Sequence, residues 1–69
     1  MKKDIPILMT DGSQKIVFQA DEEDPYMIHV LKIRKSGKVF SDTLIIIPDV
    51  DQYVSIFSRK GFFIVDENV

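Results

Sequence analysis

Apolar and polar positions alternate along much of this chain, as they do in strands that bury one face. Residues 15–20 show the pattern well, with Ile16, Phe18 and Ala20 at every second position. Valine and isoleucine supply 17 of the 31 apolar residues, and these β-branched side chains fit a pleated sheet better than a helix. The pattern predicts five strands, at residues 5–10, 15–20, 26–34, 39–47 and 62–66.

The connections between these strands carry turn residues. Asp11-Gly12 is a strong signal for a tight hairpin turn, because glycine tolerates the positive φ that such turns need. Residues 35–38 predict a second turn. The four adjacent carboxylates at 21–24 repel one another and predict a solvated connection between the two hairpins.

One segment follows a helical period instead. Asp49 is a favourable N-cap residue with Gln52 at capping-box spacing, and Gly61 suits the position after a last helical turn. The expected apolar stripe of this helix is formed by Val50, Tyr53, Val54 and Phe57. The sequence therefore predicts a single α+β domain over residues 1–69, a small antiparallel sheet of about five strands (β-β-β-β-α-β) with one helix packed on one face.

A two-residue turn at Ser36-Gly37 would sort the second hairpin onto two faces. One face would carry Met27, His29, Leu31 and Ile33 opposite Ile46, Leu44, Asp42 and Phe40. The other would carry Tyr26, Ile28, Val30, Lys32 and Arg34 opposite Ile47, Ile45, Thr43, Ser41 and Val39. We expect the first face, which is almost wholly apolar, to lie under the helix and form the core. We expect the second to be exposed.

Composition and charge exclude several classes of protein. The chain has 69 residues, a formal charge of −2 and no cysteine, so neither a disulfide nor a cysteine-ligated zinc site can form. The longest apolar runs have four residues, too few for a membrane span or a secretion signal. We expect a cytoplasmic protein that does not contact membranes.

Few residues are candidates for catalysis or for binding a cofactor. His29 is the single histidine, and Asp42 would lie diagonally across from it, as an acid–base pair or as a polar pair at the sheet margin. No serine lies in a nucleophile-elbow motif, and no glycine belongs to a phosphate-binding loop. The acidic run at 21–24 lacks the spacing of a calcium loop, so a solvated turn is favoured over a cation site or a mimic of nucleic-acid phosphates. We expect no enzyme activity, no cofactor and no metal.

One helix can shield only one face of a small sheet, so either the sheet curls to bury both sides or an apolar patch stays available for a partner or a second copy. We therefore expect a non-enzymatic interaction module, a protein-binding regulator or inhibitor that associates with itself as a homodimer. The expected partner-binding residues are Tyr26, Ile28, Val30, Lys32, Arg34, Lys35, Lys38, Thr43, Ile45 and Ile47.

The alternative is a single-stranded nucleic-acid-binding protein. Residues 32–38 hold four basic side chains, residues 25–41 contain no acid, and Tyr26 or Phe40 could stack on a base. Residues 43–49, which lead from the fourth strand into the helix, give a pattern that resembles PUR-repeat single-strand nucleic-acid binders. That resemblance implies four antiparallel strands followed by a helix, and a nucleic-acid partner.

Overall fold

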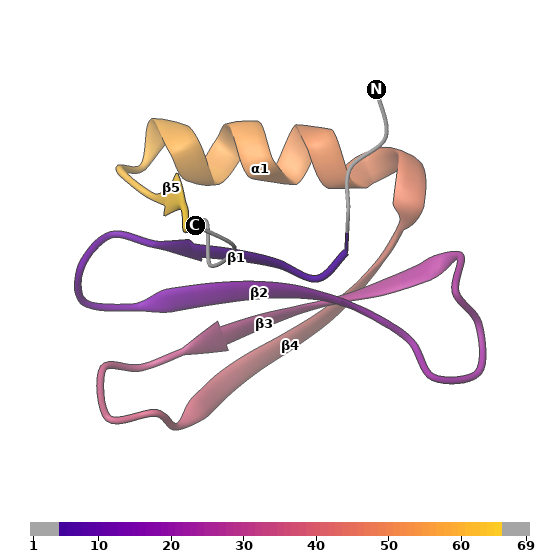
Figure 1. Ribbon diagram of the computed structural model, residues 1–69, viewed down its shortest axis with the longest axis horizontal. Helices are drawn as coiled ribbons and strands as arrows, with labels where there is room; N and C mark the ends of the chain where they lie inside the picture. The colour runs from indigo at the N-terminus through magenta and orange to yellow at the C-terminus, as the bar shows by residue number, and fades with distance from the viewer. Residues whose placement is uncertain (1–4, 66–69) are drawn as a thin grey trace.

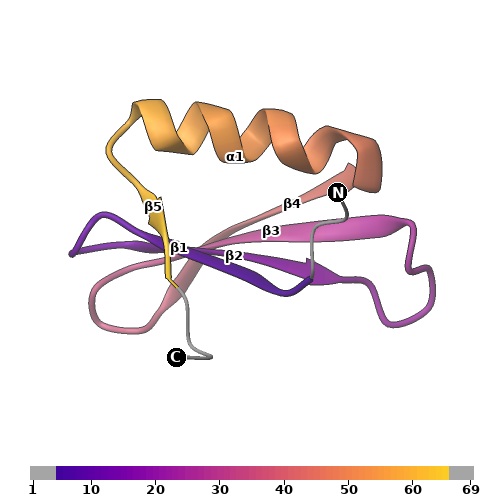
Figure 2. The ribbon, with the colours of Figure 1, turned by 45° about the horizontal axis from the view of Figure 1, so that its top comes forward.

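The structure, a computed structural model, describes residues 5–65 and has two layers, a five-stranded antiparallel sheet and one helix that covers one face of it (Figure 1; Figure 2). The strands lie in the spatial order β4-β3-β2-β1-β5. The elements are β1 (Ile7–Thr10), β2 (Lys15–Ala20), β3 (Met27–Ile33), β4 (Val39–Ile46), a 3-10 turn η1 (Ile47–Asp49), α1 (Val50–Arg59) and β5 (Phe63–Ile64). The α+β class and the predicted order of elements are confirmed.

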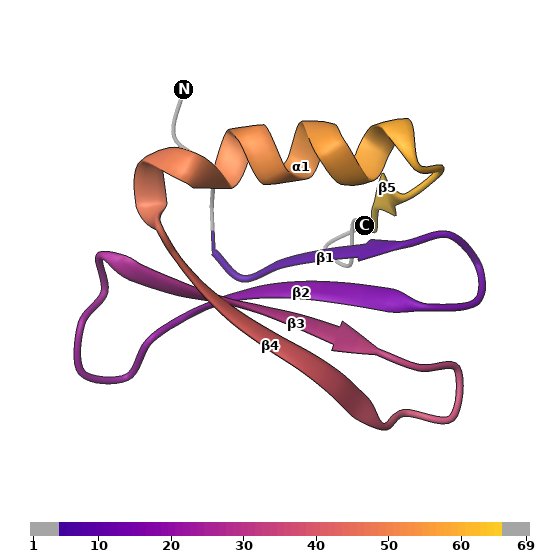
Figure 3. The same cartoon turned by 180° about the vertical axis from the view of Figure 1, so that it is seen from behind.

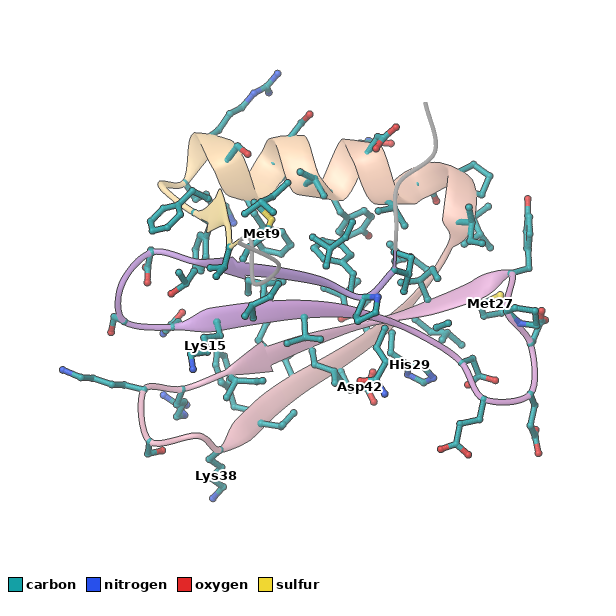
Figure 4. All side chains as sticks on the ribbon, in the orientation of Figure 1. Met9, Lys15, Met27, His29, Lys38 and Asp42 are labelled. Atoms are coloured by element: carbon teal, nitrogen blue, oxygen red, sulfur yellow. The ribbon has the colours of Figure 1, made fainter. Side chains whose placement is uncertain are left out.

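The helix packs on the face of the sheet that carries the alternating residues of the first hairpin. Met9 and Phe18 are fully buried there, and Figure 4 shows Met9 directed toward the helix. The predicted helical stripe is confirmed, because Val50, Val54 and Phe57 are buried against the sheet. The complete core consists of Ile7, Met9, Ile16, Phe18, Ile28, Val30, Ile45, Val50, Val54 and Phe57.

The predicted faces of the second hairpin are reversed. Ile28, Val30 and Ile45, which were expected to be exposed, are at most 6% exposed and lie beneath the helix. Cross-strand pairing explains the reversal: Phe18 of β2 faces Val30 of β3, so the core face of the first hairpin continues into this face of the second. The other face holds His29 and Asp42 near its centre, and ionisable groups are costly to bury there.

The register of the second hairpin is confirmed over most of its length. Residues 27–32 of β3 pair with residues 46–41 of β4 as expected, but Ile33 pairs with Val39 instead of Phe40. The tip is a three-residue loop, since Arg34 and Lys38 are joined by a 2.8 Å backbone hydrogen bond and Gly37 has a φ of 95°. A β-bulge at Phe40 then restores the register that a two-residue turn would have given.

The first hairpin loop has the predicted bounds. Thr10 pairs with Lys15, so residues 11–14 form the loop. The carboxylate of Asp11 accepts hydrogen bonds from the backbone N–H groups of Ser13 and Gln14, at 2.9 and 2.8 Å. An aspartate that bonds to the backbone two residues ahead stabilises a wider turn than the Asp-Gly dipeptide alone would indicate.

The two ends of α1 differ in how they are closed. Asp49 makes no side-chain capping bond, because η1 precedes the helix and holds Asp49 in a helical conformation; the predicted capping box is wrong. At the other end Gly61 has a φ of 98°, and Phe62 N–H donates to the carbonyl of Phe57 at 3.0 Å. This Schellman motif turns the ring of Phe62 onto that of Phe57, with 5.7 Å between the ring centroids. The chain then enters β5, which is shorter than predicted, and Asp66 of the predicted strand lies outside the described residues.

Candidate interaction surface and histidine cluster

The face of the sheet that α1 does not cover has an apolar surface. Leu44 is 51% exposed and Ile46 is 36% exposed, while Leu31 and Ile33 of the neighbouring strand are half-buried. Leu8 and Val17 extend this surface across β1 and β2, and both are half-buried. Sequence reasoning assigned Leu31, Ile33, Leu44 and Ile46 to the core, so it missed them as surface residues.

Strand β4 forms one edge of the sheet. It is eight residues long, and within residues 5–65 no segment lies beyond it (Figure 1; Figure 3). Ile47 N–H donates to the carbonyl of Tyr26, so the backbone groups of Ile47 point toward β3. In an antiparallel pair, the backbone groups of successive residues point alternately toward and away from the partner strand. The N–H and C=O groups of Asp42, Leu44 and Ile46 therefore point away from β3. A row of outward N–H and C=O groups beside exposed apolar side chains is a template for another strand.

The two ends of β4 carry opposite charge. Before the strand, the hairpin tip bears the exposed residues Arg34, Lys35 and Lys38. After it, Asp49 and Asp51 begin the helix. The acidic connection 21–24 lies at this second end as well, because Met27 pairs with Ile46. Figure 4 shows Lys38 and Met27 at opposite ends of the hairpin.

The basic residues of the hairpin do not form one cluster. Lys32 is half-buried on the helix side, with its Nζ 5.7 Å from the ring centroid of Phe57. The guanidinium carbon of Arg34 lies 4.5 Å from the ring centroid of Phe40. Lys35 and Lys38 are exposed. Of the four basic side chains, two are therefore occupied by aromatic rings of the same chain.

His29 lies between two carboxylates on the face that the helix leaves open. Its Nε2 is 2.6 Å from Oδ1 of Asp21, and its Nδ1 is 3.0 Å from Oδ1 of Asp42. Figure 4 shows His29 and Asp42 side by side on the opposite side of the sheet from Met9. The expected contact with Asp42 is confirmed, while the contact with Asp21 was not anticipated. The imidazole thus connects the loop after β2, the middle of β3 and the edge strand β4.

The cluster changes the protonation of its members. The hydrogen bond to Asp21, followed by that to Asp42, raises the pKa of His29 above its ordinary value of 6.5. The same bond to His29, aided by the backbone N–H of Glu23, lowers the pKa of Asp21 below 3.8. An imidazolium has an N–H donor on each nitrogen and can satisfy both carboxylates, whereas a neutral imidazole has one donor and satisfies one.

A pocket of about 380 Å³ opens beside the cluster, between the loop after β2 and strand β3. Asp21, Glu22, Glu23 and Asp42 line it with His29, so the lining would attract a cation rather than an anion. Within residues 5–65, no group of three or more histidine, aspartate or glutamate side chains has the geometry to hold a metal ion. Chemically, the arrangement places one titratable imidazole between two carboxylates and joins three segments of the chain.

The residues that the sequence proposed for partner binding fall into two groups. Ile28, Val30 and Ile45 are buried under α1 and cannot meet a partner while the domain is folded. The others reach the surface at least in part: Tyr26, Lys32, Arg34, Lys35, Lys38, Thr43 and Ile47. One signal in the sequence could have given the correct surface, since His29 and Asp42 on one face already argue against burying that face.

No protein-family model, curated protein or solved structure matches the chain. Across residues 5–65, no helix has both the length and the apolar character needed to cross a membrane.

Proposed function

We propose that this protein is a non-enzymatic interaction module that binds protein and associates with itself through the open face and edge of its sheet. The observation that carries the proposal is the exposure of Leu44 and Ile46 on an edge strand whose backbone groups point outward. Exposed apolar residues on an uncovered sheet edge mark a surface that gains stability from being covered. The proposed surface replaces the one expected from Ile28, Val30 and Ile45.

Sedimentation equilibrium at micromolar concentration tests the proposal. The wild type should have twice the monomer mass, and Ile46→Lys should reduce it to the monomer mass, because a charge would then lie among the apolar side chains of the contact. Ile56→Lys is the matched control, since Ile56 is a 37% exposed apolar residue on α1 and not on the sheet. A wild type that stays monomeric at every concentration would contradict self-association, as would an Ile46→Lys variant that stays dimeric.

The alternative function is binding of single-stranded nucleic acid through the exposed hairpin tip, where Lys35 and Lys38 lie beside Arg34. Its support is weaker than the sequence indicated, because Lys32 contacts Phe57 on the helix side. A labelled single-stranded oligonucleotide distinguishes the two functions. Affinity that falls steeply with salt and with Lys35→Ala would favour nucleic acid, whereas an apolar protein contact should persist in high salt.

The histidine cluster has a structural explanation in the three segments that it joins. We therefore keep the proposal non-enzymatic. The cytoplasm stays the proposed location, since a chain without cysteine gains nothing from an oxidising compartment.

A further inference from the structure

We infer that the partner of strand β4 is β4 of a second copy, paired antiparallel about a two-fold axis at Thr43 to give a continuous ten-stranded sheet. This inference rests on the proposed self-association and specifies its geometry. Addition of a strand to an open edge is a common mode of protein recognition. A contact that uses the same strand on both copies is closed and yields a dimer instead of a fibre.

The charges at the ends of β4 select the antiparallel direction. The basic hairpin tip with Lys35 and Lys38 precedes the strand, and the acidic residues Asp49 and Asp51 follow it. Antiparallel pairing brings the basic tip of each copy to the acidic end of the other, and the symmetry provides this contact twice. Parallel pairing would bring the two basic tips together, which is unfavourable.

The outward backbone groups select the register. Because Asp42, Leu44 and Ile46 direct their N–H and C=O groups outward, these residues must bond to one another across the new ladder. An axis at Asp42 would oppose two carboxylates, which is destabilising. An axis at Thr43 instead places Asp42 opposite Leu44 of the second copy and Ile46 opposite Phe40, so nearly the whole of β4 is paired.

This register also joins the two open faces into one surface. Directly opposed residues in an antiparallel ladder project to the same side of the sheet, so Leu44 of both copies lies on the side away from the helices. Both copies of α1 then lie on the other side. The dimer would hold two His29 clusters on its open face, one on each side of the axis, because His29 pairs with Leu44.

The absence of cysteine from the chain allows a direct test by single-cysteine cross-linking of the whole 69-residue chain. Thr43 is exposed, and at the axis its two copies form a non-hydrogen-bonded pair with Cα atoms about 4.5 Å apart. A disulfide fits that distance. Thr43→Cys should therefore form a covalent dimer under mild oxidation at concentrations where the wild type is dimeric.

Ile46→Cys is the matched control on the same strand. Antiparallel pairing separates its two copies by about 20 Å along the strand, so Ile46→Cys alone should not cross-link. Parallel pairing would cross-link both variants. Ser55→Cys, on the exposed side of α1, measures random collision.

Failure of the inferred geometry is distinguishable from failure of self-association. If the wild type is dimeric but only Leu8→Cys, on the open face, or Ile64→Cys, on β5, cross-links, the dimer exists and the β4 geometry is overturned. If the wild type is monomeric by sedimentation, self-association fails and the geometry fails with it. Cross-linking of Thr43→Cys but not of Ile46→Cys or Ser55→Cys supports the inference.

A charge exchange provides an independent test of direction. Lys35→Glu with Lys38→Glu should weaken the dimer by about tenfold, because both end contacts become repulsive. Mixing that variant with Asp49→Lys, Asp51→Lys should restore association, since each tip then meets an end of opposite charge. In parallel pairing the two basic tips would face each other, and the Lys35→Glu, Lys38→Glu variant would replace them with two acidic tips, which repel equally. A dimer affinity that this variant leaves unchanged would therefore contradict the antiparallel arrangement.

Discussion

The two faces of the sheet carry similar aliphatic side chains, yet the helix covers only one of them. On the covered face Phe18, Ile28 and Val30 are at most 2% exposed. On the open face Leu31 is half-buried, and His29 and Asp42 lie beside it. Apolar content therefore does not decide which face becomes the core. The deciding property is whether the centre of the face is free of groups that would lose their hydration.

Deleting a buried aromatic ring and an exposed one should give the largest difference. Phe18→Ala should lower the free energy of unfolding by about 3–5 kcal/mol, because a fully buried ring leaves a cavity. Phe40→Ala should cost about 1 kcal/mol or less, since Phe40 is 39% exposed and its recorded ring contact is with Arg34. Urea denaturation measures both. Equal losses would contradict the assignment of Phe18 to the core.

Two adjacent residues of β4 test the same comparison with one substitution. Ile45 points under the helix and is 6% exposed, whereas Leu44 points to the open face and is 51% exposed. Ile45→Lys should cost about 3 kcal/mol or more, because it buries an unpaired charge. Leu44→Lys should change the stability of the folded monomer by less than about 0.5 kcal/mol.

Thermal unfolding followed by circular dichroism, at a concentration below that at which the protein associates, separates the two outcomes. A fully unfolded Leu44→Lys variant would show that the open face belongs to the core. Ile45→Lys is unsuited to testing self-association, because a loss of dimer could follow from a loss of the fold.

Local sequence signals predicted the elements but not the choice of face. Alternation located β2 at its observed bounds, and the spacing of Val50, Val54 and Phe57 predicted the buried stripe of α1. The face was assigned by counting apolar residues within one hairpin. Two other observations give the correct face: the polar pair His29 and Asp42 on the open side, and the pairing between hairpins, where Phe18 meets Val30. That contact is set by register across a connection of several residues, which no local pattern specifies.

The candidate site was predictable in part for the same reason. Alternation placed His29 and Asp42 on one face, and their 3.0 Å contact follows from the register. Asp21 was assigned to a solvated acidic run, and nothing in that run distinguishes it from its three acidic neighbours. Its position arises from the loop itself, where Asp21 N–H donates to the carbonyl of Met27 and so brings the side chain to the imidazole.

The smallest expected effect concerns pH, and it should come from the open face. The hydrogen bonds to Asp21 and Asp42 raise the pKa of His29 above 6.5, so protonated His29 stabilises the fold fully below about pH 6.5. That stabilisation is lost as the pH rises through the raised pKa of the folded state. The lowered pKa of Asp21 has the opposite consequence, with stabilisation present above about pH 3.8 and lost as the pH falls through the lowered value.

The cluster should therefore stabilise the protein most between about pH 4 and pH 6.5, and stability should decline on the alkaline side. The decline should be small, because His29 is partly exposed and solvent screens the cluster. Urea midpoints from pH 5 to 9 measure it, and the His29 ring signal in NMR gives its pKa without ambiguity, since the chain has one histidine. His29→Gln should remove the alkaline decline.

Asp11→Asn is the control, because Asp11 bonds to backbone N–H groups in the first hairpin and has a lowered pKa. This substitution should change the stability only on the acid side of the pH range. An alkaline decline that persists in His29→Gln would assign the pH dependence to other groups and leave the two carboxylates without a role in it.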